Sequence, residues 1–457
     1  MKKIFLLTLL FFSVLPAAAQ KITLANQQNF RQEISRLFAR EQQASATLAA
    51  QYAQAQKQHY TSTQTTVDTS SSIPGNLSQK VHRAYASQTN AFKRPEKQWQ
   101  IALFLAAESR PFGETLGTIK WLVRKGFLRR AAILRAPNGT DNGQLYFVYN
   151  SPNGAVTEKL QIDSSVTSTD LLFPLFSNME TGDSLYNAIL VDAHGGGMEM
   201  SYAKDSWLEV EDLLQALQKA DLQTDILNLD SCHMGSFYTV YQIARYKNVK
   251  YLLASSDFMY APSDKMYYLL LQNLHLSPRQ AAVNTTRQKK NLFTFSAQYE
   301  VNNSLAIDLR PLYTVAEEWF KSYGVFMFSL EEPGKQQLNA PFDPRLGEVR
   351  SLHKIIRRQL AYFENNEKEL YNLWNTACYF KSAYDGFIQN SQKMLEALEE
   401  SVLEQWCYSP QLNKMYNNHI PANIDCADGI SVTQEQLSRL LDEQSEMLEN
   451  ESFCWPR

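Results

Sequence analysis

Two short apolar runs in the middle of the chain each lead directly into residues that can do chemistry. Residues 188–191 precede Asp192-Ala-His194, and the chain then breaks into three glycines at 195–197. Residues 226–229 precede Asp230-Ser-Cys232. An apolar run that ends in glycine is typical of a buried strand followed by a loop that permits close backbone approach. We therefore predict two strands, with His194 at the end of the first and Cys232 at the end of the second.

The segment between these runs predicts a helix that makes the two strands parallel. Apolar residues recur at helical spacing between 206 and 220, after a capping-box pattern that pairs Ser206 with Glu209. A strand–helix–strand crossover places the carboxyl ends of both strands on the same edge of the sheet. Ligands bind at that edge in open α/β sheets. One strand brings an imidazole there, His194, and the other brings a thiol, Cys232.

A thiol beside an imidazole suits nucleophilic catalysis, because a nearby histidine or helix N-terminus favours the reactive thiolate. A lone cysteine at a strand end is ordinarily a small buried side chain. Here His194, its glycines and a helix predicted from near Gly235 favour a catalytic pair. The backbone N–H groups of Gly195 and Cys232 are the candidates to hold an oxyanion. His233 is a weaker partner for the thiol, because neighbouring residues of an extended chain point to opposite faces.

The residues around this pair resemble a known family. His-Gly after one strand, Asp-Ser-Cys-x-Met-Gly-Ser at 230–236 and Ala-Ser at 254–255 are together similar to the clostripain family of caspase-like cysteine peptidases. The resemblance covers residues 99–312. It implies cleavage of protein or peptide substrates after Arg or Lys by a dyad and a thioester acyl-enzyme. Cys232 would be the nucleophile and His194 the general acid and base.

The resemblance also implies an acidic pocket for the basic side chain of the substrate. Asp230, two residues before the nucleophile, matches one pocket acid, and Asp257 and Asp264 are both available as the second. The loop that carries them departs from the usual acidic, glycine-rich version. Relatives mature by a cut between the two catalytic strands, which makes Lys204 the candidate processing site; an ordinary solvated lysine is the alternative.

Several of these residues have other interpretations. Asp230 also suits a carboxylate that caps the next helix, and Asp192 could orient the imidazole or act as a cap. A metallohydrolase that uses His194, Asp192, His233 and Asp230 matches no common ligand spacing. A binding or scaffold protein that keeps the fold without turnover is the alternative function. The atypical pocket loop and the long C-terminal extension favour that alternative.

The rest of the chain predicts a caspase-like, doubly wound α/β/α sandwich with a mostly parallel central sheet. Further strands are expected at 99–106, 251–254 and 304–309, a strand pair at 133–148 and a helix from Pro278. After Pro311 long helical patterns follow, including 349–363 and 389–406. We expect four parts: a signal peptide, a helical or linker segment that suits a pro-region, the peptidase core and a mainly helical region, at 1–19, 20–95, 96–312 and 313–457.

Export follows from the first residues. Two lysines, a short apolar run and Ala-Ala-Ala at 17–19 are typical of a secretory signal peptide. We therefore expect a secreted or periplasmic protein with no stable membrane anchor.

The near balance of 44 basic and 47 acidic residues gives no reason to expect nucleic acid as a partner. No cofactor is expected, and the residues do not indicate whether calcium matters. Four of the five cysteines fall after residue 377, where two disulfides could form.

Overall fold

The computed structural model describes only part of the chain. The chain divides into two compact units, residues 1–74 and 75–457, and all described residues belong to the second unit. The predicted signal peptide, Lys204, Asp257, Asp264 and three of the four C-terminal cysteines lie outside the described residues. The described residues are 85, 96–106, 112–136, 143–151, 154–162, 168–180, 184–203, 206–256, 266–293, 302–330, 335, 338, 351–368, 380–408, 429–433 and 436–442.

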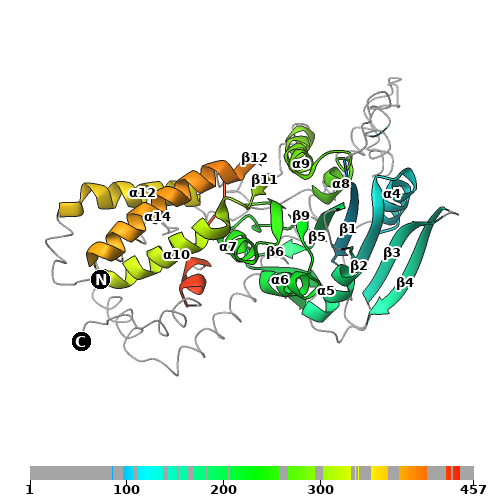
Figure 1. Ribbon diagram of the computed structural model, residues 1–457, viewed down its shortest axis with the longest axis horizontal. Helices are drawn as coiled ribbons and strands as arrows, with labels where there is room; N and C mark the ends of the chain where they lie inside the picture. Colours follow the sequence, from blue (N-terminus) through cyan, green and yellow to red (C-terminus); the bar gives the residue numbers. More distant parts are fainter. Residues whose placement is uncertain are drawn as a thin grey trace, which may run out of the picture. The chain divides into compact units, whose positions relative to one another are not determined.

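The described strands form a nine-stranded sheet in the order β12-β11-β10-β9-β5-β1-β2-β3-β4 (Figure 1). The five central strands run parallel and antiparallel strands close both edges. The parallel strands are β1 (Gln98–Leu105), β2 (Leu128–Arg135), β5 (Leu185–Asp192), β9 (Thr224–Asp230) and β10 (Val249–Ala254). The edge strands are β3 (Gly143–Ser151), β4 (Gly154–Ile162), β11 (Asn302–Asp308) and β12 (Val402–Tyr408).

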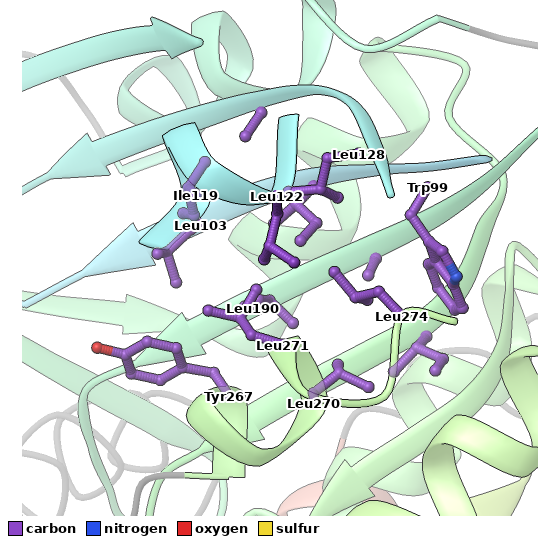
Figure 2. Close-up of a cluster of buried hydrophobic side chains, with 14 of the residues drawn as sticks. Trp99, Leu103, Ile119, Leu122, Leu128, Leu190, Tyr267, Leu270, Leu271 and Leu274 are labelled. Carbon is purple, nitrogen blue, oxygen red and sulfur yellow. The ribbon is translucent and has the colours of Figure 1, made fainter. Parts of the chain in front are cut away.

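Helices cover both faces of the sheet, which confirms the predicted α/β/α sandwich. One layer holds α4 (Phe112–Lys125), α8 (Met266–Leu271) and α9 (Pro278–Phe293), and the other holds α5 (Ser168–Ser177), α6 (Val210–Lys219) and α7 (Phe237–Tyr246) (Figure 1). Every residue of β9 is buried, as expected for a parallel strand that is covered on both faces. Figure 2 shows the core on the α4 and α8 side, where Leu103 and Leu190 of the sheet meet Leu122 and Leu271.

The described part of the region after Pro311 is mainly helical and packs on the core. Its helices are α10 (Leu312–Ser329), α12 (Leu352–Asn365) and α14 (Phe380–Ser401). Trp319 of α10 meets Phe237 of α7 edge to face, with ring centroids 5.3 Å apart. The helix predicted for 389–406 ends earlier, because residues 402–408 form β12 and pair antiparallel with β11. That pairing with a distant strand overrides the local helical pattern.

The helix between the two central strands also begins later than predicted. Residues 206–209 form strand β8, which belongs to a small sheet with β6 (His194–Gly195) and β7 (Glu199–Ala203). The expected N-cap at Ser206 is therefore wrong. Glu209 is the N-cap residue, and its capping box is completed by Asp212. The β6–β8 hairpins follow directly after β5, at the carboxyl end of that strand.

Candidate active site

The two central strands bring His194 and Cys232 to the same edge of the sheet. β5 and β9 are parallel neighbours, and Asp192 lies in register with Asp230. His194 and Cys232 each lie two residues beyond that matched pair, at the same edge: His194 begins the short strand β6, and Cys232 lies in the turn before α7. This confirms the predicted strand–helix–strand arrangement. His194 is half-buried, and Cys232 is 5% exposed.

The backbone of Gly195 lies directly against the backbone of Cys232. A Cβ atom built on Gly195 would be 2.2 Å from the carbonyl oxygen and 3.0 Å from the nitrogen of Cys232. Only glycine fits at such a separation without a shift of the backbone. The residue that follows the imidazole therefore touches the residue that carries the thiol. The two N–H groups predicted to hold an oxyanion belong to these two residues.

A second link joins the two loops through Ser236, the last residue of the Asp-Ser-Cys-x-Met-Gly-Ser motif. Its hydroxyl donates to the carbonyl oxygen of Gly197 at 2.6 Å, and the hydroxyl of Thr239 donates to the same oxygen at 3.0 Å. Ser236 is also the N-cap of α7, since its Oγ accepts from the Thr239 N–H. Both residues are fully buried. No role was predicted for Ser236, although Gly-Ser before a helical pattern is an N-cap signal.

Residues 232–235 form a turn between β9 and α7, with His233 in the left-handed region at φ 59°. Cys232 and His233 are therefore not successive residues of an extended chain, and strand alternation does not describe them. The turn is anchored at Gly235, whose N–H donates to the Ser255 carbonyl at 2.6 Å. A Cβ on Gly235 would lie 2.9 Å from the Ser256 nitrogen, so glycine is needed here as well. The Ala-Ser pair of the motif is thus in contact with the turn that carries the thiol.

The two carboxylates in register are both buried. Asp230 is 1% exposed, and its Oδ2 accepts the Tyr267 backbone N–H at 3.2 Å near the start of α8. Asp230 therefore caps a helix, but that helix is α8 and not the helix after Cys232. Burial raises the pKa of the Tyr267 phenol well above its ordinary value, and the negative charge of Asp192 raises that pKa further.

The described part of the chain offers neither a metal centre nor a membrane-spanning helix. Within it, no group of three or more His, Cys, Asp or Glu side chains is placed to hold a metal ion. The four residues of the metallohydrolase hypothesis are all described and do not form such a group. Among the helices that the structure describes, none combines the length and apolar character needed to span a bilayer.

The fold and the site define an α/β/α sandwich protein with a thiol and an imidazole at the ends of neighbouring parallel strands. A sequence model of the clostripain family matches residues 197–436, which is more than half of the chain. The chain belongs to the clostripain family and is a cysteine-type peptidase. Cys232 lies inside the matched span, and His194 lies three residues before it.

Solved structures of the same family are similar to this chain at low identity. A secreted C11 cysteine protease from Bacteroides thetaiotaomicron is 14% identical, with a TM-score of 0.48, over 76% of this chain and 98% of that one. An inactive zymogen C11 protease from Parabacteroides distasonis is 14% identical, with a TM-score of 0.46, over 77% and 97%. No curated protein sequence matches the chain significantly.

Proposed function

We propose that the protein is a secreted endopeptidase that cleaves peptide bonds after Arg or Lys with a dyad of Cys232 and His194. The observation that supports this most directly is the contact of Gly195 with Cys232, because it brings the two loops together at the edge where α/β sheets bind ligands. The register of Asp192 with Asp230 supports it too, since it places both loops at the same height along the sheet.

The chemistry follows from these two side chains. The thiolate of Cys232 attacks the carbonyl carbon of the scissile bond, and the N–H groups of Gly195 and Cys232 stabilise the oxyanion that forms. His194 then gives a proton to the departing amine, which leaves a thioester on Cys232. Water attacks the thioester, His194 accepts the proton of that water, and the acid product leaves with the thiol restored. This reaction requires no cofactor.

Specificity for a basic residue rests on a buried carboxylate beside the nucleophile. Asp230 precedes Cys232 by two residues and has one oxygen committed to the Tyr267 N–H. A carboxylate has several acceptor positions, so Asp230 can also bind the cationic end of a substrate. Asp257 or Asp264 would supply the second pocket charge. Lys204 is the proposed processing site, and export would depend on residues 1–19.

Reporter peptides with Arg, Lys, Asp or Asn at the cleaved position test the proposal. The parent protein should turn over only the Arg and Lys peptides, and Cys232→Ala and His194→Ala should abolish turnover while the fold is kept. Equal activity of Cys232→Ala and the parent would remove the thiol from the mechanism. No turnover by the parent, before or after a cut at Lys204, would favour the non-catalytic binding protein.

A further inference from the structure

The C-terminal end of the chain returns to the loop that carries the thiol. We call residues 429–433 and 436–442 the clasp. The Ser431 N–H donates to the Gly235 carbonyl at 3.1 Å, and the Ser431 carbonyl accepts the Phe237 N–H at 2.6 Å. These two backbone bonds pair the clasp with both sides of Ser236. Since Phe237 is the first residue of α7, the clasp also satisfies an N–H group that the helix itself cannot.

The clasp touches the loops after the neighbouring strands as well. A Cβ on Gly197, in the loop that follows His194, would lie 2.7 Å from Nε2, the side-chain amide nitrogen of Gln436. The hydroxyl of Ser256, just after β10, donates to the Gly429 carbonyl at 2.5 Å. The clasp therefore contacts the loops that follow β5, β9 and β10. These are the three loops that carry the imidazole, the thiol and the Ala-Ser motif.

Gln436 is held in place by its own capping box. Its Oε1 accepts the Thr433 N–H at 3.2 Å, and the Thr433 Oγ1 accepts the Gln436 N–H at 3.3 Å. Only 6% of Gln436 is exposed. Because the cap uses the oxygen of the amide, the nitrogen is directed at Gly197. The oxygen and the nitrogen of the Gln436 side-chain amide thus make different contacts. A substitution can therefore remove the contact at Gly197 and keep the capping box.

The other side of the clasp is attached to the helical region. The Leu352 N–H at the start of α12 donates to the Ile430 carbonyl at 3.0 Å, and Ser431 bridges antiparallel to Ser351. The clasp therefore lies between the loop of the nucleophile and the start of α12. Its position does not depend on the catalytic loops alone.

We propose that the clasp fixes the relative placement of the His194 and Cys232 loops, with Ser431 and Gln436 as positioning residues. The inference rests on the proposed dyad. Loops that leave a sheet edge are more mobile than the strands before them, whereas a dyad must be held to within a fraction of its hydrogen-bond length. Contacts from one buried segment to both loops reduce that freedom. Ser431 and Gln436 act through these loops and not on the substrate, so neither is a catalytic residue.

Ser431→Pro tests the backbone part of the clasp, with Ser431→Ala as its matched control. Proline lacks the N–H that donates to Gly235, whereas alanine keeps both backbone bonds. We expect kcat for an Arg reporter peptide to fall about 10- to 100-fold in Ser431→Pro, with KM close to that of the parent. Ser431→Ala should keep the parental kcat.

Gln436→Glu tests the side chain and decides the matter if Ser431→Pro does not fold. Glutamate keeps an oxygen for the Thr433 N–H, and so keeps the capping box, but it replaces the nitrogen at Gly197 by an oxygen.

The second readout is the pH dependence of Cys232 alkylation by iodoacetamide, measured by mass spectrometry of the Cys232 peptide. Misplacement of His194 should raise the pH at which alkylation becomes fast, because less thiolate is paired with imidazolium.

The outcomes separate this inference from the proposed function. A parent without Cys232-dependent turnover contradicts the proposed function, and the alkylation profiles of the variants then still test the clasp. If the parent is active and the folded variants Ser431→Pro and Gln436→Glu match it in kcat and in alkylation profile, the clasp has no positioning role. A loss of thermal stability alone, with unchanged kcat and profile, would also overturn the inference.

Discussion

Gly195→Ala is the substitution that most directly tests how the site is assembled. The new Cβ would lie 2.2 Å from the Cys232 carbonyl oxygen, 2.8 Å from the Ser231 Cβ and 3.0 Å from the Cys232 nitrogen. Two of these three atoms belong to the backbone, so no flexible side chain can move away. The strain must be relieved by a shift of the His194 loop, the Cys232 turn or both.

The size of that shift follows from ordinary contact distances. Van der Waals contacts of a Cβ begin at 3.4 Å, so the two loops must separate by about 1 Å. A misplacement of about 1 Å at reacting groups costs roughly 100-fold in rate, and overpacking costs about 1–3 kcal/mol of stability. We therefore expect kcat to fall about 100-fold and the free energy of unfolding to fall by about 1–3 kcal/mol.

The assay compares Gly195→Ala with Gly117→Ala, a control of identical chemistry. Gly117 is an exposed residue of α4, and a Cβ there meets nothing within 4 Å. Alanine is a better helix former than glycine, so this control should keep the parental kcat and gain about 0.5–1 kcal/mol in urea unfolding. Steady-state kinetics with an Arg reporter peptide are measured for both proteins. A folded Gly195→Ala protein with parental kcat would refute the close packing of the two loops.

Three further substitutions test other parts of the structure. Asp230→Asn keeps an oxygen for the Tyr267 N–H but removes the negative charge. We expect kcat/KM for Arg and Lys peptides to fall sharply while the melting temperature stays close to the parental value. Unchanged kcat/KM would exclude a role of Asp230 in the substrate pocket. Ser391→Ala removes the acceptor of the buried Trp319 indole, 3.1 Å away, and should cost about 1–3 kcal/mol in urea unfolding. Burial raises the pKa of the Tyr313 phenol from 10.0 to about 12, so the unfolded chain ionises first and stability falls as pH rises through that window. Tyr313→Phe should lose less stability than the parent there, and equal losses would contradict this.

The central strand–helix–strand unit was predictable because its signals are local. Each apolar run is long enough for one buried strand, and the glycines after His194 mark the turn. The helix start was predicted three residues too early, because Ser206 with Glu209 fits the capping-box sequence pattern, whereas the pair that forms the box, Glu209 with Asp212, does not. The first pair contains the commoner N-cap residue. Pairing of β8 with β7 decided between them, and that contact is not visible in the local pattern.

The parts that the sequence did not predict depend on distant partners. Residues 402–408 continue a helical pattern, yet β11 offers an unpaired edge that they complete. Ser256 and Gly429 are 173 residues apart, and no periodicity links them. Ser431 makes its contacts through the backbone, so its side chain carries no signal of its role. Only the Thr433 and Gln436 capping box was readable, and it predicts a helix start without naming what the helix touches.

These long-range contacts show that residues after 312 contribute to the sheet and to the turn that carries the thiol. A chain that ended after residue 312 would lack β12, which would leave β11 as an open edge. It would also lack the carbonyl that accepts the Phe237 N–H, at the first residue of the helix that follows the nucleophile turn. Because Leu352 and Gly235 bind opposite sides of the same short segment, a displacement of α12 has a direct route to that turn. Helix α12 and the clasp therefore form one support for the turn that carries the thiol.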